Sequence, residues 1–337
     1  MDASRIPKAF ASAKQVAKLA GVSRSAVSRA FTPGASISEE KRQRILSAAE
    51  QLGYHVNHLA RGLTGRQSGI VCLAVADSDT PYLSRVLRTL IEHLQKAGRV
   101  AMVLGTSGPT QDVEEALKQT LNYRADATVV LSGTPSQSII RTCMDNGQRL
   151  ILINRDDHIA GPRNIGIDNA WAAETALHTF LRAGCRRLAV VTSEAGTPSL
   201  VAREQAFTRL AAERGVEVVA FAKGRTSYEC GAEAARALLA VTERPDAAFC
   251  VTDLIACGFM DIARQEFRMA VPEDICVIGF DDIDQAGWGS YRLTTFSPPI
   301  DALAERVVEL LTADGDAGEA ADIVLKPDFI WRSSARP

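Results

Sequence analysis

The chain has 337 residues, of which 46% are hydrophobic and 23% are charged, an ordinary balance for a globular protein with a sizeable core. No apolar run reaches the roughly 18 residues that a membrane-spanning helix requires, and residues 1–15 lack the apolar stretch of a secretory signal, so we expect a cytoplasmic protein without a membrane partner. The seven cysteines contain no C-x-x-C pair, and Cys72, Cys250 and Cys276 lie in apolar runs, which favours buried thiols over metal ligands or disulfides.

Residues 1–66 carry most of the positive charge. They contain eleven Lys and Arg against four Asp and Glu, a net charge of +7, although the whole chain carries −2. The rest of the chain therefore has a net charge of −9. A compact basic segment on an acidic body predicts a polyanion as the partner of that segment. A solvated basic tail is the alternative, but the segment has a helical apolar periodicity that a tail would lack.

The basic segment predicts two short helices joined by a tight turn. Gly21 can end the first helix by adopting a left-handed conformation, and Ser23 is a suitable N-cap for the second. The residues predicted to face inward are Val16, Ala17, Leu19 and Ala20 in the first helix and Ala26, Val27 and Ala30 in the second. Two helices in this arrangement are typical of a helix-turn-helix.

A third helix is predicted after Ser38, whose side chain can cap it, and Glu39 and Glu40 suit the positive first turn. Its apolar stripe consists of Ile45, Leu46, Ala49 and Leu52, and Gly53 follows. These residues would complete a three-helix unit.

The second helix is the one expected to read DNA. If it enters a major groove, its first residues Arg24 and Ser25 face base edges, and Arg29 lies farther along the same face. Arginine can bind guanine O6 and N7 with two hydrogen bonds, worth about 1–3 kcal/mol of discrimination, whereas hydroxyl side chains suit phosphate oxygens. The predicted DNA contacts of this unit are Ser12, Ser23, Arg24, Ser25, Ser28, Arg29 and Thr32. The alternative is a solvent-exposed face of a small helical bundle.

The run QVAKLAGVSRSAVSRAF, followed by SISEEKRQRILSAAEQLGYHVNHLARGL, resembles the N-terminal domain of the LacI family of repressors. The VA–LAGVS–VSR core with the LGY-xx-N-xx-AR-x-L tail is far more discriminating than a general helix-turn-helix pattern. The resemblance continues through the rest of the chain. It implies double-stranded operator DNA as a partner, a homodimer on a pseudo-palindromic site, and control by a small-molecule effector.

The resemblance also implies a role for residues 57–63. In the family this segment is a hinge that orders as a short helix on the operator, and a leucine at the position of Leu63 wedges between base pairs in the minor groove. Asn57, Ala60 and Leu63 are accordingly expected to contact DNA. Seven residues are too few for a stable isolated helix, and Gly62 weakens this one further, so its folding can be coupled to DNA binding. The alternative is a plain linker with an incidental leucine.

From Ser68 onward, apolar strand-like runs alternate with amphipathic helical stretches. The predicted strands are 70–76, 100–106, 127–132, 150–154, 187–193, 216–222, 246–252 and 275–282. This alternation is typical of parallel sheets covered by helices on both faces, and two such sets predict two Rossmann-like lobes. The stretch resembles the effector domain of the LacI family, which shares its fold with periplasmic sugar-binding proteins. That resemblance implies three crossovers between lobes, expected near 155–167, 285–295 and 315–325.

The predicted chain is thus α/β overall, with three parts. An all-α helix-turn-helix domain covers residues 1–56, a hinge segment covers 57–67, and a two-lobed periplasmic-binding-protein-like domain of parallel sheets, for effector binding and dimerisation, covers 68–337. The absence of a C-terminal heptad run favours a dimer over a tetramer.

Ligands of open parallel sheets bind beyond the carboxyl ends of the strands, so we expect the effector between the lobes. The predicted contacts are Asp77, Tyr82, Asn154, Arg155, Arg203, Asp253, Asp281 and Trp288. The resemblance implies that Arg203, Asp253 and Asp281 hold ligand hydroxyls or carboxylates. Because arginines suit an anionic group and the acids suit hydroxyls, a sugar or sugar acid is predicted. The alternatives are that Asp253 and Asp281 are N-caps of following helices and that Arg203 is a surface helix residue.

The sequence shows no sign of an enzyme. It has no G-x-G-x-x-G after a strand, no Walker loop and no G-x-S-x-G elbow, and its five histidines lack metal-ligand spacing. We therefore predict no catalytic residue, metal or cofactor. A periplasmic transport protein is the best rival for residues 68–337, and the basic segment argues against it.

Overall fold

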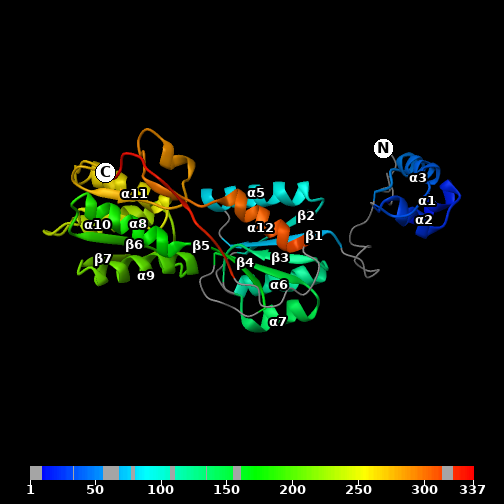
Figure 1. Ribbon diagram of the computed structural model, residues 1–337, viewed down its shortest axis with the longest axis horizontal. Helices are drawn as coiled ribbons and strands as arrows, with labels where there is room; N and C mark the ends of the chain where they lie inside the picture. The colour runs from blue at the N-terminus through cyan, green and yellow to red at the C-terminus, as the bar shows by residue number, and fades with distance from the viewer. Residues whose placement is uncertain are drawn as a thin grey trace, which may run out of the picture. The chain divides into compact units, whose positions relative to one another are not determined.

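In a computed structural model of the chain, the residues described are 10–32, 34–55, 68–76, 80–106, 111–133, 135–154, 161–312 and 322–337. The chain divides into two compact units, Met1–Ser68 and Gly69–Pro337 (Figure 1). No helix within these described ranges is both long and apolar enough to cross a membrane.

The first unit contains the three predicted helices, α1 (Ala13–Ala20), α2 (Arg24–Ala30) and α3 (Glu39–Leu52). Ser12 and Gln15 form a reciprocal capping box at the start of α1, and Gly21 ends this helix with a left-handed φ of 63°. Ser23 caps α2 by accepting a hydrogen bond from the amide of Ala26. Ser38 stands at the N-cap of α3, but its side chain makes no capping hydrogen bond.

The core of this unit is small and rich in alanine. Its buried residues are Val16, Ala17, Ala20, Val27, Ala30, Ile45, Ala48 and Ala49. The inward positions predicted for Leu19 and Leu52 are wrong, since Leu19 is 52% exposed and Leu52 is 37% exposed. Helices packed this closely bury only a narrow arc of each helix surface, and these two leucines lie outside it. Arg42 of α3 adds a polar tie, donating to the carbonyl oxygens of Ala30 (2.6 Å) and Ala35 (3.3 Å).

The second unit begins with a parallel sheet in the order β11-β5-β4-β3-β1-β2, here called lobe 1. Its strands are β1 (Ile70–Ala76), β2 (Val100–Thr106), β3 (Ala127–Val130), β4 (Arg149–Ile153), β5 (Arg163–Ile167) and β11 (Ile323–Leu325). Its helices are α5 (Pro81–Lys96), α6 (Gln111–Asn122), α7 (Gln137–Asp145) and α12 (Ile300–Thr312). Helices α5 and α12 cover one face of this sheet, and α6 and α7 cover the other (Figure 1). Alternate residues of β1 serve the two faces: Leu73 packs among residues of α5 and α12, and Ala74 packs among residues of α6 and α7.

Lobe 2 is built on a parallel sheet in the order β7-β6-β8-β9. Its strands are β6 (Leu188–Thr192), β7 (Val218–Ala222), β8 (Ala247–Cys250) and β9 (Cys276–Ile278). Helices α8 (Asn169–Arg182) and α9 (Pro198–Glu213) pack together, as do α10 (Tyr228–Leu239) and α11 (Asp253–Gln265), and a short 3-10 helix, η1 (Asp284–Gly287), follows β9. The buried rings of Phe180, Phe207 and Phe249 belong to one continuous core.

The chain passes between the lobes later than predicted at each of the three crossovers. β5, inside the predicted crossover 155–167, pairs with β4 of lobe 1, and Asp168 then caps α8 of lobe 2. β10 (Thr295–Ser297) pairs with β12 (Asp328–Ile330) in a separate antiparallel pair, and α12 and β11 lie in sequence between them. β5 escaped prediction because its sequence, RNIGI, lacks a continuous apolar run.

Helices α10 and α11 approach closely at two glycines. A Cβ on Gly231 would overlap the carbonyl oxygen of Ile255, and one on Gly258 would overlap the carbonyl oxygen of Tyr228. Both neighbours are backbone atoms, which cannot turn aside as a flexible side chain could. These glycines therefore set the helix separation.

We expect Gly258→Ala to destabilise lobe 2 by about 1–3 kcal/mol or more, because α10 and α11 must move apart. Gly289→Ala is the matched control, since nothing lies within 4 Å of a Cβ built there. Thermal unfolding of the full chain measures both variants. Equal melting temperatures for Gly258→Ala and wild type would show that the crossing is not tightly packed.

Candidate functional site

The exposed face of α2 carries the polar residues predicted to meet DNA. Arg24, Ser25, Ser28 and Arg29 are exposed, while Val27 between them is buried. The helix therefore presents its cationic and hydroxyl groups outward, as an element inserted into a groove requires.

Short-range hydrogen bonds hold part of this face in place. The hydroxyls of Ser23 and Ser25 lie 2.8 Å apart, and Arg29 Nε donates to the carbonyl oxygen of Ser25 at 3.4 Å. Thr32 is half-buried and donates to the carbonyl oxygen of Ser28. Ser12, at the start of α1, is exposed and engaged in its capping box. Asn57, Ala60 and Leu63 lie outside the described residues, so their predicted contacts remain sequence-based.

In the second unit, the structure brings four predicted effector residues together. Tyr82 lies in the first turn of α5, Asn154 follows β4, Arg203 lies in the second turn of α9, and Asp281 lies beyond β9. Asn154 Nδ2 and the Tyr82 hydroxyl are 3.3 Å apart. Burial, followed by the negative charge of Asp281, raises the pKa of Tyr82, while the positive charge of Arg203 opposes this rise. Two residues of lobe 1 thus face two residues of lobe 2, and we call these four the interlobe cluster.

Arg203 is only 2% exposed, so the alternative that it is a surface residue is wrong. Its Nε donates to Asn169 Oδ1 at 2.8 Å, and one terminal nitrogen donates to the carbonyl oxygen of Val251 at 2.7 Å. The guanidinium also lies over the Phe280 ring, with its carbon 3.4 Å from the ring centroid. These contacts compensate the burial of the charge and fix the plane of the guanidinium.

Asp281 is buried in an uncommon backbone conformation. Its φ of 114° is rare for a residue with a side chain, and Asp282 follows with a φ of 50°. Burial raises the pKa of the Asp281 carboxyl well above its usual value, and the charge of Arg203 opposes that rise. Asp281 is not an N-cap, because Ile283 holds that position for η1.

The interlobe cluster contains one unsatisfied acceptor. Asn154 Oδ1 is buried and has no hydrogen-bond partner among the described residues. A buried amide oxygen without a donor costs free energy, so a ligand hydroxyl or amine reaching it would be favoured. Asn154 itself has a positive φ of 56°, which asparagine tolerates better than most residues.

Asp253 is fully buried, and both of its carboxylate oxygens are engaged. Oδ1 accepts from the Thr295 hydroxyl at 2.5 Å, and Oδ2 accepts from the Ile283 amide at 3.0 Å. The N-cap of α11 is Thr252, so the capping alternative for Asp253 is wrong. A Cβ on Gly279 would overlap Asp253 Oδ1, which explains a glycine there. Because its Oδ2 holds the amide of Ile283, Asp253 helps to position the turn that carries Asp281.

The other predicted effector residues lie apart or outside the described residues. Trp288 follows η1 and is 55% exposed. Asp77 and Arg155 lie outside the described residues. Their contacts with an effector remain predictions. The described residues contain no group of His, Cys, Asp or Glu side chains arranged to hold a metal ion.

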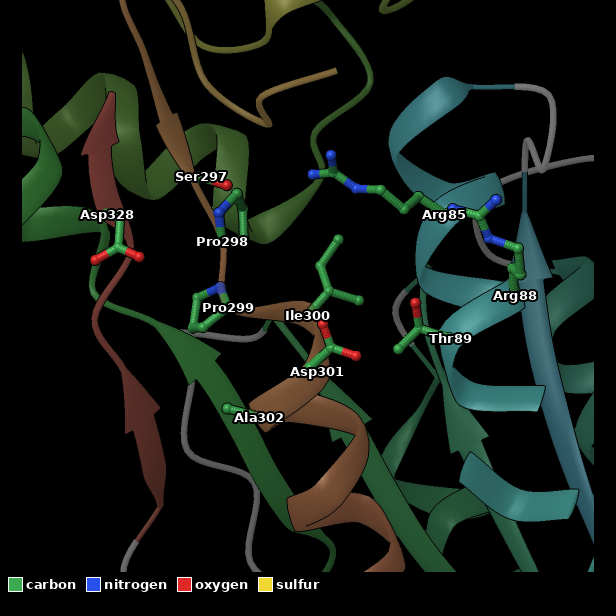
Figure 2. A pocket seen from close by; sticks show the side chains of 10 residues that line it. All are labelled: Arg85, Arg88, Thr89, Ser297, Pro298, Pro299, Ile300, Asp301, Ala302 and Asp328. Carbon is green, nitrogen blue, oxygen red and sulfur yellow. The ribbon is translucent and has the colours of Figure 1, made fainter. Parts of the chain in front are cut away.

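A hollow of about 460 Å³ lies beside the interlobe cluster, between α5 and the segment that leads into α12 (Figure 2). It is lined by Arg85, Arg88, Thr89, Ser297, Pro298, Pro299, Ile300, Asp301, Ala302 and Asp328. None of these is a predicted effector residue.

Comparisons with known proteins agree with this organisation. The family described as "Bacterial regulatory proteins, lacI family" matches residues 12–57, and that described as "Periplasmic binding protein-like domain" matches residues 177–335. The HTH-type transcriptional regulator GalR of Escherichia coli (strain K12) is 28% identical over 331 residues, which cover 96% of each chain. The Lac repressor dimer bound to operator and the anti-inducer ONPF is similar in structure, with a TM-score of 0.86 and 19% identity over 97% of this chain and 99% of that one. The CelR–cellobiose complex has a TM-score of 0.69 and 24% identity over 96% of this chain and 100% of that one.

A helix-turn-helix unit followed by two parallel-sheet lobes defines a DNA-binding transcription regulator whose second unit is a periplasmic-binding-protein-like domain. The chain belongs to the LacI family of transcriptional regulators. The predicted fold class is confirmed, and the family places the chain among regulators of transcription, not among enzymes.

The buried carboxyl of Asp253 generates a prediction about pH. Burial raises its pKa to about 7, against hydrogen bonds that lower it, whereas an unfolded aspartate titrates near 3.9. Between these values the folded chain holds the extra proton, so this group makes the free energy of unfolding fall as pH rises from about 4 to about 7. The raised pKa of Asp281 acts in the same direction. We expect Asp253→Asn to reduce the slope with which the free energy of unfolding falls as pH rises, by at most about 1.4 kcal/mol per pH unit.

Urea unfolding of wild type and Asp253→Asn at pH 5, 6 and 7 measures the difference. All other carboxylates are common to the two chains, so their contributions cancel to first order. Identical pH slopes would show that Asp253 does not hold a proton in the folded state.

Proposed function

We propose that this LacI-family regulator is a repressor that binds a pseudo-palindromic operator as a homodimer, under the control of a sugar or sugar acid held between the lobes. The observation that carries the effector part is the interlobe cluster, in which Arg203 and Asp281 of lobe 2 face Tyr82 and Asn154 of lobe 1. In this proposal residues 1–56 bind DNA, 57–67 form the hinge, and 68–337 bind the effector and dimerise.

The DNA-binding part rests on α2. Its exposed arginines, Arg24 and Arg29, supply the donors that guanine O6 and N7 accept, and its exposed hydroxyls suit phosphates. A homodimer would present two such helices to two half-sites, one helical turn or a multiple apart. Support comes from the Lac repressor structure, a dimer bound to operator.

The effector part rests on complementary chemistry. Asp281 can accept from ligand hydroxyls, Asn154 Oδ1 is an acceptor without a donor, and the Arg203 guanidinium supplies positive charge beside them. A polyhydroxylated ligand with a carboxylate would meet all three needs. The CelR complex contains cellobiose, which supports a sugar, and the buried arginine favours an acid over a neutral sugar.

The coupling between the two sites follows from the two lobes. A ligand touching Tyr82 and Asp281 contacts both lobes, so it favours one angle between them. In a dimer that angle sets the spacing of the two hinge segments and hence their ability to fold on DNA. Couplings of this kind are typically about 1–3 kcal/mol.

We expect Arg24→Ala to weaken operator binding by about 1–3 kcal/mol, and to do so mainly by losing discrimination at one base pair. Ser28→Ala is the matched control on the same face; it should weaken binding to all duplexes about equally, because a phosphate contact carries no sequence information. Fluorescence anisotropy with operator and scrambled duplexes, repeated over a salt series, measures both effects. If the wild-type chain binds no duplex at low salt, the proposed function is wrong.

We expect gluconate or glucuronate to raise the melting temperature of the wild-type chain more than glucose does, because binding to the folded state stabilises it. Arg203→Lys keeps the charge but loses the planar fork that meets Asn169 and Val251. We expect this variant to bind the acids about tenfold more weakly, a loss of roughly 1.4 kcal/mol of binding free energy, and therefore to be stabilised less by them. DNA binding without effector should be retained. Stabilisation by glucose and not by the acids would reject a sugar acid and leave a neutral sugar.

A further inference from the structure

We infer that Arg85 of α5 is a positioning residue that latches lobe 1 to the Asp281–Asp282 turn of lobe 2 and thereby sets both the closure of the lobes and the place of Asp281. Neither the sequence patterns nor the family resemblance singled out this residue. The part of the inference that concerns the effector rests on the proposed function.

The latch consists of two hydrogen bonds across the lobes. One terminal nitrogen of Arg85 donates to the carbonyl oxygen of Asp281 at 2.6 Å, and the other donates to the carbonyl oxygen of Asp282 at 2.7 Å. The donors are charged and the planar guanidinium matches two successive carbonyls, so the pair is stronger than two neutral bonds and specific in direction. Arg85 Nε is buried without a partner among the described residues, which confines the grip to the two terminal nitrogens.

The turn that Arg85 grips needs such support. Asp281 and Asp282 have φ values of 114° and 50°, a conformation that residues with side chains adopt only when their surroundings impose it. Two further contacts come from lobe 2 and the chain end: Arg332 pairs with the Asp282 carboxylate at 2.7 Å, and Asp253 accepts from the Ile283 amide at 3.0 Å. Arg85 is the contribution of lobe 1 to this set.

The consequence is a mechanical link between lobe angle and effector site. Asp281 belongs to the interlobe cluster, and its main chain is held by a side chain of the other lobe. Any movement of α5 relative to lobe 2 must break the Arg85 bonds or displace Asp281. Figure 2 shows Arg85 and Arg88 projecting from α5 beside the hollow, whose other side is the Ser297–Ala302 segment that leads back to lobe 1.

The test uses the full-length chain without DNA or effector. Hydrogen exchange at the amides of residues 281–283 reports the turn, and energy transfer between dyes on Lys118→Cys and Glu213→Cys reports the lobe angle. Both sites are exposed, one in each lobe, and all seven native cysteines are buried, so the introduced thiols are labelled selectively. The variants are Arg85→Ala and, as a control one turn along the same helix, Arg88→Ala, whose residue is exposed.

We expect Arg85→Ala to speed exchange at residues 281–283 by roughly tenfold and to shift the energy-transfer efficiency, while Arg88→Ala leaves both at wild-type values. Arg85→Lys keeps the charge but is shorter and lacks the planar fork that places one nitrogen at each carbonyl oxygen, so it should give the same direction of change; it replaces Arg85→Ala if that variant does not fold. Wild-type exchange and wild-type energy transfer in a folded Arg85 variant would overturn the latch. Because neither readout involves DNA or effector, that result would leave the proposed function standing, and failure of operator binding would leave these readouts unaffected.

Discussion

The burial of three ionisable side chains near the carboxyl ends of the lobe 2 strands constrains much of the surrounding structure. Arg203, Asp253 and Asp281 are each no more than 6% exposed, and burying a charge is costly unless other groups compensate it. Compensation comes from distant parts of the chain. Asn169 and Val251 bind Arg203, while Thr295 and Ile283 bind Asp253. Four separate segments are thereby tied to one end of one sheet.

This arrangement makes the interlobe cluster polar and ties it to the position of the two lobes. Arg203 and Asp253 of lobe 2 are held by fixed partners, so their side chains cannot readily rearrange. Tyr82 and Asn154 approach them from lobe 1, and Arg85 holds the main chain of Asp281 and Asp282 from the same side. A ligand bound here, as proposed above, would act on the relation between the lobes.

The first unit is stabilised in a different way. Five of its eight core residues are alanines, so the area that it buries is small, and caps and polar ties carry a larger share of its organisation. The capping box at Ser12, the left-handed Gly21 and the Arg42 bonds to Ala30 and Ala35 are examples. A small unit of this kind can keep one helix face free of apolar residues, and α2 uses that freedom to expose arginines and hydroxyls.

Features that depend on local pattern can be predicted without the structure. The Gly21 and Ser23 caps, the α2 face and nearly all the buried strands follow from periodicity and capping chemistry, because these signals lie within a few residues of one another. The sequence also pointed to Tyr82, Asn154 and Asp281, which follow strands, and the family resemblance pointed to Arg203. Long-range packing, by contrast, determines which of these residues meet and why Asp253 is turned inward. It also gives Arg85, Thr295 and Gly279 their importance. Those partners lie up to about two hundred residues apart along the chain. No short-range pattern encodes such pairings, because they exist only once the crossovers bring the two lobes face to face.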